Sequence, residues 1–139
     1  MKNSKPKTIN LNPCLGIPVV YDPALKVIAD SRGLARWKKV FVGPVFCAFP
    51  PREQQALLLH EVGHCKLRHL ERRLLAALVL LFWPPALARY CRAQEFQADL
   101  FVLHCGYGKD LAQAFLRLRS THASPLHPPL QARIARLLA

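Results

Sequence analysis

Acidic side chains are scarce in this sequence. Eight Asp and Glu stand against 20 Lys and Arg, so the formal net charge at pH 7 is +12. Such a charge favours negative partners, whether nucleic acid, anionic membranes or acidic proteins, without choosing among them. The basic residues are dispersed and no recognised nucleic-acid motif accompanies them, so we do not expect a nucleic-acid partner.

Paired cysteines are also lacking. The number of cysteines is odd, no CxxC pair occurs, and the spacings are wide: Cys14, Cys47, Cys65, Cys91 and Cys105. This pattern favours reduced thiols over a disulfide framework. One thiol could ligate a metal, but the paired spacing typical of such ligands is missing. The N-terminal lysines are followed by no apolar stretch, so we expect no secretory signal and a cytoplasmic location.

A chain of 139 residues provides one domain, and its character changes once along its length. Residues 1–16 are polar and broken by prolines, which indicates a flexible or extended arm before a domain at 17–139. Short β-branched and aromatic runs up to residue 49 predict a small N-terminal β-sheet, and the segments rich in Leu, Gln and Ala after it predict helices. The predicted fold class is therefore α+β. We expect strands at 17–21, 26–29 and 40–42, helices at 52–70, 86–105 and 110–119, and a last helix after Pro128-Pro129.

Residues 60–64 read His-Glu-Val-Gly-His, which matches HExxH. On a helix, residues four apart lie one turn apart on the same face, so the imidazoles of His60 and His64 can reach one ion. Glu61 then points at the remaining coordination position, where it can accept a proton from zinc-bound water as that water attacks a carbonyl. Gly63 gives up helix propensity, as expected where another backbone or a substrate comes close. The alternative is two histidines on a surface helix beside an ordinary glutamate.

A catalytic zinc normally takes three protein ligands and leaves one position open. The metzincin pattern HExxHxxGxxH is rejected, because Leu67 and Leu70 stand at its glycine and its third histidine, and His69 is one residue out of register. Glu95 is the better candidate, because Asp99 follows it on the same helix face and can reach a ligand histidine. A solvated acidic face is the alternative, and it is disfavoured in a chain with only eight acids.

Three motifs together resemble those of one protein family. They are HEVGH at 60–64, EFQAD at 95–99 and HPPLQARI at 127–134. Their order is similar to HExxH, ExxAD and HPPxxxRI in HtpX-like and CAAX prenyl endopeptidase-type gluzincins, which are zinc metallopeptidases. The resemblance covers roughly residues 17–138 and implies a compact, zincin-like member, with the HExxH helix, the glutamate helix and C-terminal helices following the sheet.

The resemblance implies a role for each residue of the first two motifs. One Zn²⁺ per chain would be bound by His60, His64 and Glu95. Glu61 would act as general base, and Asp99 would orient one ligand histidine, His60.

The third motif implies two further residues near the site. His127 and Arg133 would help to hold the substrate or the oxyanion. A short insertion follows Thr121-His122, so His122 could take the place that we assign to His127. A loop histidine without function is the alternative for both.

An apolar stretch without charge covers residues 74–88 and has arginines on both sides. It is shorter than the roughly 20 residues of a bilayer crossing, and Pro84-Pro85 interrupts it. His64 and Glu95 flank the stretch, so two crossings would be needed to return the chain to one zinc, and we exclude a true span. We expect a helical hairpin insert that either dips into an anionic membrane surface through 72–92, on the cytoplasmic face, or packs on the core or on another protein.

These observations predict a zinc-dependent endopeptidase acting on a protein or peptide substrate. The two metal-binding helices should lie beneath an edge strand at 40–46, where an extended substrate could add as a further strand. Two alternatives remain: a non-catalytic zinc-stabilised membrane or protein interaction module, and a basic protease acting on DNA-bound proteins. The sequence indicates neither the substrate's identity nor the oligomeric state.

Overall fold

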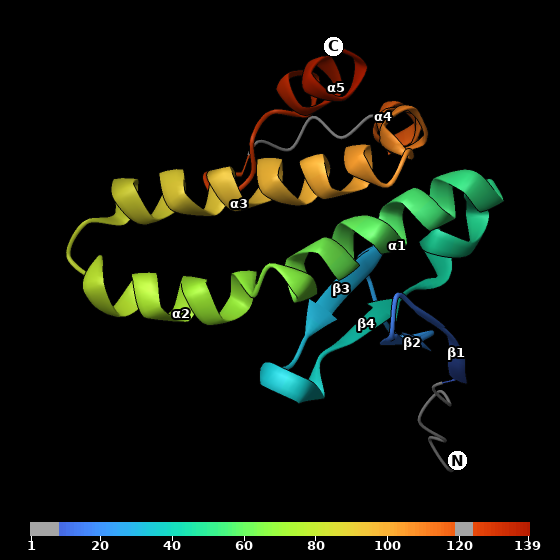
Figure 1. The fold of residues 1–139 in the computed structure, drawn as a ribbon, viewed down its shortest axis with the longest axis horizontal. Helices are drawn as coiled ribbons and strands as arrows, with labels where there is room; N and C mark the ends of the chain where they lie inside the picture. The colour runs from blue at the N-terminus through green and yellow to red at the C-terminus, as the bar shows by residue number, and fades with distance from the viewer. Residues whose placement is uncertain (1–8, 119–123) are drawn as a thin grey trace, which may run out of the picture.

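The computed structural model describes residues 9–118 and 124–139, which form a small mixed sheet followed by five helices (Figure 1). This is the α+β class that the sequence predicts. The strands are β1 (Ile9–Cys14), β2 (Ile17–Tyr21), β3 (Ala29–Arg32) and β4 (Lys39–Val42), with short 3₁₀ helices η1 (Ala35–Trp37) and η2 (Pro44–Ala48) beside β4. The helices are α1 (Pro51–Lys66), α2 (His69–Val79), α3 (Pro84–His104), α4 (Gly108–Leu118) and α5 (Leu130–Leu138).

The sheet has the order β1-β2-β4-β3, with β2 and β4 parallel and the other pairs antiparallel. The predicted edge strand at 40–46 is wrong: β4 is an inner strand, and the edge beside the helices is β3. The physical reason is burial, because Val40 and Val42 are fully buried whereas β3 carries the partly exposed pair Asp30 and Arg32. Charged side chains tolerate a solvated edge and blunt its tendency to aggregate.

Two other strand predictions also need correction. The strand expected at 26–29 begins only at Ala29 and runs on to Arg32. The arm predicted at 1–16 is part of the sheet from Ile9 on, because β1 pairs with β2 through Ile9–Tyr21 and Leu11–Val19. The reversal between the two strands uses left-handed backbone at Leu15 and Gly16 (φ 47° and 78°).

Helix α1 begins at Pro51, which suits a first helical turn because its fixed φ is already helical and its missing N–H is not needed there. The helix was expected to reach Leu70 but ends at Lys66, since Arg68 adopts the left-handed conformation (φ 56°) and the chain restarts as α2. The buried Lys38 ammonium reinforces this break: it donates to the Cys65 carbonyl and pairs with Glu71 of α2, both at 2.7 Å.

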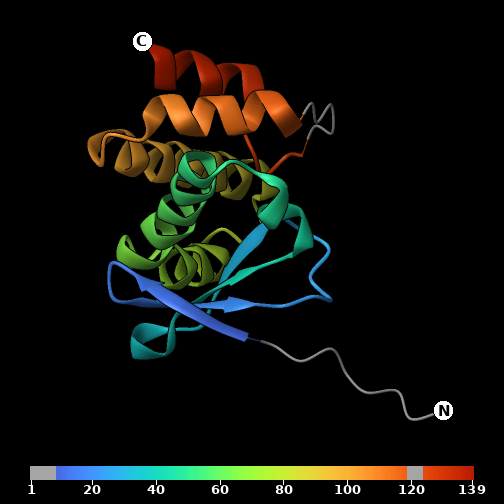
Figure 2. The ribbon, with the colours of Figure 1, turned by 90° about the vertical axis from the view of Figure 1, so that its right-hand side faces the viewer.

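Helix α1 is the central layer of the fold. It packs on the sheet on one side and on α3 and α4 on the other, with α5 covering α4 (Figures 1 and 2). Its residues Ala56, Leu59 and Val62 belong to the main apolar core. A Cβ on Gly63 would stand 3.3 Å from the Phe101 side chain of α3, so this glycine serves the close approach of two helices. The HExxH segment therefore lies at the centre of the molecule.

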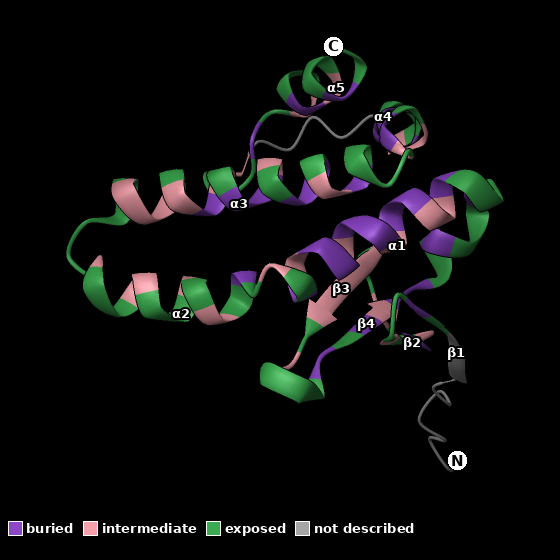
Figure 3. Cartoon of the chain, in the orientation of Figure 1, coloured by how far each residue is buried: buried purple, intermediate pink, exposed green. Residues whose placement is uncertain are grey.

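Helices α2 and α3 form the expected hairpin, reversing at residues 80–83 (Figure 1). The half of the hairpin near α1 is packed, with His69 and Gln94 buried, whereas the far end is exposed (Figure 3). Among the described residues, no helix combines the length and the apolar character that a bilayer crossing requires.

Candidate metal centre

Three polar side chains from two helices converge between α1 and α3. His60 and His64 come from successive turns of α1, and Glu95 comes from the middle of α3. The two Nε2 atoms are 3.1 Å apart; one Glu95 oxygen lies 3.4 Å from Nε2 of His60, and the other lies 3.5 Å from Nε2 of His64. The tertiary structure thus brings together the three residues that the sequence predicted as ligands.

These spacings fit one small cation with nitrogen and oxygen ligands. Zinc binds such atoms at about 2.0–2.2 Å, so two ligands of a tetrahedral zinc stand about 3.3 Å apart. The three distances of 3.1–3.5 Å bracket this value. Two imidazoles and one carboxylate are also the ligand set of a known class of catalytic zinc sites. The residues therefore fit zinc in both chemistry and spacing.

The outer nitrogen of His60 has a carboxylate partner. Asp99, one turn after Glu95 on α3, places Oδ1 3.0 Å from Nδ1 of His60. Donation of the Nδ1 hydrogen to Asp99 leaves the Nε2 lone pair for a metal, which is the usual arrangement of a ligand histidine. Asp99 thus lies against His60, the histidine that it was predicted to orient.

Arg133 holds Asp99 from the other side. Its Nε and Nη2 donate to the two Asp99 oxygens, each at 2.7 Å, and its guanidinium lies 4.3 Å over the Phe115 ring. Its third nitrogen, Nη1, is 3.5 Å from Glu95. All three guanidinium nitrogens thus face carboxylates of the centre. Arg133 therefore acts on His60 through Asp99. It also lines the cleft, so its predicted help in holding the substrate stays a prediction.

The outer nitrogen of His64 has a partner that the sequence analysis missed. His69 Nδ1 lies 2.8 Å from His64 Nδ1, and His69 Nε2 lies 3.0 Å from Oε1 of Gln97 on α3. From the sequence alone, His69 is only a candidate metal ligand that stands one residue out of register. The left-handed turn at Arg68 brings His69 back beside His64. A continuous helix through residues 60–70 would not predict this position.

The burial of His69 decides which nitrogens of His64 and His69 carry a hydrogen. Burial, helped by the neighbouring His64, lowers the pKa of His69 to about 4, so His69 is neutral at pH 7 and has one donor and one acceptor. Its Nε2–H donates to Gln97, and its Nδ1 accepts the Nδ1–H of His64. The lone pair of His64 is then on Nε2, the atom that faces His60 and Glu95. Gln97 and His69 together select the metal-binding tautomer.

The electrostatics of the centre favour a positive charge between the ligands. Burial by itself would lower the pKa of His60, but its hydrogen bonds to Asp99 and Glu95 outweigh this and raise the pKa to about 9. Burial would raise the pKa of Glu95, yet contacts with His60 and His64 hold it well below the usual range. Both shifts show that the carboxylates of Glu95 and Asp99 stabilise a positive charge on His60. The same carboxylates would stabilise a metal cation bound between the ligands.

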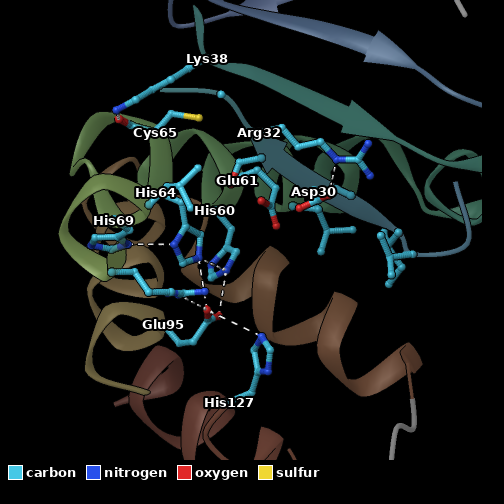
Figure 4. Close-up of a pocket in the computed structure, with 18 of the residues that line it drawn as sticks. Asp30, Arg32, Lys38, His60, Glu61, His64, Cys65, His69, Glu95 and His127 are labelled. Carbon is cyan, nitrogen blue, oxygen red and sulfur yellow. Dashed lines mark hydrogen bonds and ion pairs between the residues drawn. The ribbon is translucent and has the colours of Figure 1, made fainter. Parts of the chain in front are cut away.

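A cleft of about 550 Å³ opens onto the three ligand atoms. One wall is the edge strand β3 with Asp30 and Arg32, and the floor is α1, where Glu61 points into the same space as the ligands (Figure 4). His127, in the segment before α5, lies across the cleft with Nε2 3.8 Å from Glu95, and its side chain is about half exposed. Glu61 and His127 are thus placed where predicted, whereas His122 lies outside the described residues.

The cysteines do not join the centre. All five are free thiols within the described part of the chain, and the cluster of potential metal ligands there consists of His60, His64 and Glu95. Cys65 lies on the cleft wall, where burial raises the pKa of its thiol to about 11 and keeps it protonated at neutral pH.

Comparisons of the chain with protein-family models, with curated proteins and with solved structures found no match. The resemblance to gluzincins therefore stays a prediction based on the three motifs. The case for the site depends on the geometry of these side chains.

The outer partner of His64 supplies a testable prediction. His69→Ala is expected to weaken zinc binding about 10–100-fold, because loss of a group that orients a ligand has effects of this size. Competition with a zinc chelator of known affinity measures the change. His104→Ala, at an exposed histidine near the end of α3, is the control. Equal zinc affinities for the two variants would show that His69 does not orient His64.

Proposed function

We propose that this chain is a zinc-dependent endopeptidase of zincin-like fold. The observation that carries the proposal is the convergence of two histidine Nε2 atoms and a Glu95 carboxylate, 3.1–3.5 Å apart, at a cleft that Glu61 also faces. His60, His64 and Glu95 would hold the ion. Bound there, zinc supplies Lewis-acid chemistry, which polarises a peptide carbonyl and makes water more acidic.

Glu61 is the residue of this chain that would move the proton. Its carboxylate lies beside the ligands and inside the cleft, within the space where water and a peptide carbonyl must meet. It would accept the proton of the attacking water and pass it to the leaving amine. A zinc that only stabilised the fold would need neither an adjacent carboxylate nor an open cleft.

The edge of β3 is the element on which an extended substrate would bind. This strand uses one side to pair with β4, and residues 29–33 line the cleft. A peptide lying along β3 would extend the sheet through main-chain hydrogen bonds and pass over the ligand atoms. Asp30 and Arg32, paired at 2.6 Å, offer both signs of charge to its side chains.

Zinc content and peptide cleavage test the proposal together. Purified wild-type chain is expected to contain about one zinc by elemental analysis and to cleave an unstructured protein in a reaction stopped by a chelator and restored by zinc. Absence of zinc would refute the proposal. Zinc without cleavage of any unstructured protein would instead favour the non-catalytic zinc-stabilised interaction module.

A further inference from the structure

The α2–α3 hairpin ends in an apolar surface that no other part of the described chain covers. We define the hairpin tip as residues 78–83. Phe82 is 95% exposed and Trp83 is 65% exposed, and Leu75, Leu78, Val79 and Leu81 beside them are exposed as well. In the view coloured by burial, the segment that joins the two helices is exposed and no residue at this end of the hairpin is buried (Figure 3). A contiguous apolar surface of this kind marks an interaction site.

Basic side chains flank the hairpin tip on both helices. Between Arg72 and Gln94 the chain has no acidic residue and four arginines: Arg72, Arg73, Arg89 and Arg92. Arg73 turns inward, donating to Gln94 and lining the cleft, and Arg92 donates to the Pro125 carbonyl, so Arg72 and Arg89 are the two nearest the tip that face outward. Arg72 precedes the end of α2 by seven residues and Arg89 follows the start of α3 by five, so both stand about 8–10 Å from the tip along their helices. That distance matches the 5–10 Å to which interfacial helices sink between lipid headgroups.

We propose that the hairpin tip docks on an anionic membrane surface. Phe82 and Trp83 would enter the boundary between acyl chains and headgroups, where aromatic side chains concentrate. The arginines of both helices would meet the lipid phosphates at the level above. The hairpin enters one leaflet only, since no described helix can cross a bilayer.

Charge selects a membrane over a second copy of the chain. Tip-to-tip association would bring Arg72 and Arg89 of two copies together on chains that each carry a net charge of +12. An anionic bilayer instead satisfies both features at once, because it offers an apolar interior beneath a negative layer.

Docking would also orient the metal centre. Leu70, Glu71 and Arg73, at the base of α2, line the cleft, and the tip lies at the other end of this 11-residue helix. The cleft would therefore stand about 15 Å from the immersed tip, above the headgroups. Polypeptide close to the membrane surface would be within reach.

The two tryptophans of the chain provide the test. Trp83 is at the tip, and Trp37, which is 70% exposed, lies in η1, which contacts the base of α2 through Ala35 and Glu71 rather than the tip. Trp37→Phe leaves emission from the tip alone, and Trp83→Phe leaves emission from the sheet side alone. With vesicles of mixed phosphatidylcholine and phosphatidylglycerol, we expect Trp83 to shift to shorter wavelength and to be quenched by brominated acyl chains, while Trp37 changes little.

A charged residue at the tip should weaken binding to the vesicles. Phe82→Asp is expected to weaken vesicle partitioning about tenfold or more, because the aromatic side chain that would be buried in the membrane is lost. Equal responses of both tryptophans, no response, or equal binding to pure phosphatidylcholine would overturn the proposal. A concentration-dependent shift of Trp83 without vesicles would assign the tip to self-association instead. Glu61→Gln should dock like the wild type, so the test is independent of catalysis.

Discussion

Glu61→Gln is expected to retain about one zinc per chain and to lose peptide cleavage by about 10³-fold. The amide keeps the size of the side chain but cannot accept the proton of the attacking water, and general base catalysis contributes about 10²–10⁴-fold. The outer nitrogens of His60 and His64 are held by Asp99 and His69, so the change at Glu61 should leave the two imidazoles in place. Initial rates on one unstructured protein, at matched zinc content, measure the loss.

The matched control is a carboxyl-to-amide change far from the cleft. Asp110→Asn removes a surface pairing with Arg52 and leaves the metal centre untouched, so it should cleave at nearly the wild-type rate. If Glu61→Gln cleaved as fast as this control, Glu61 would not be the base, and the mechanism would have to be rebuilt on another group in the cleft.

Glu95→Gln is expected to lose most of the zinc. The change removes the negative charge of a carboxylate that lies 3.4–3.5 Å from the Nε2 atoms of His60 and His64, whereas Asp99 and His69 still hold the two imidazoles. Removing a ligand should cost more than the 10–100-fold that outer partners control. Zinc per chain should therefore fall from about one to well below one after dialysis against a weak chelator. Elemental analysis, with circular dichroism to show that α3 remains folded, provides the measurement.

The zinc content of Glu95→Gln also tests whether Glu95 is the third ligand. Asp110→Asn again serves as control and should keep its zinc. Zinc retained in Glu95→Gln would contradict the predicted ligand set. His127 would then be the next candidate, since its Nε2 is 3.8 Å from Glu95.

Features that depend on local spacing were predicted well. The i, i+4 pair of His60 and His64, and the pair of Glu95 and Asp99, needed only helix geometry to place each pair on one face. Because the chain has only eight acidic residues, the pair Glu95 and Asp99 on one helix face indicated a functional site. The helices α3 and α4 begin and end within two residues of the expected positions, and α5 begins where expected, after Pro128-Pro129.

Features that depend on distant contacts were not predicted. The strand beside the cleft was misassigned, because strand order follows from the burial of Val40 and Val42 under α1 rather than from any local pattern. The function of His69 escaped because it needs the left-handed turn at Arg68 and the acceptor Gln97 from another helix. The position of Arg133 against Asp99 brings together residues 34 apart in the chain.

The sequence by itself determined which residues are candidates for the metal centre: the histidines and the glutamate of HEVGH and the carboxylates of EFQAD. It also indicated an apolar hairpin too short to cross a membrane. Residue type and helical periodicity are local properties, and they suffice for that. Only the tertiary structure decided how these groups are used. The spacing of the ligand atoms, the tautomers of His60 and His64, the wall formed by β3 and the exposed hairpin tip all depend on packing between elements that are remote in sequence.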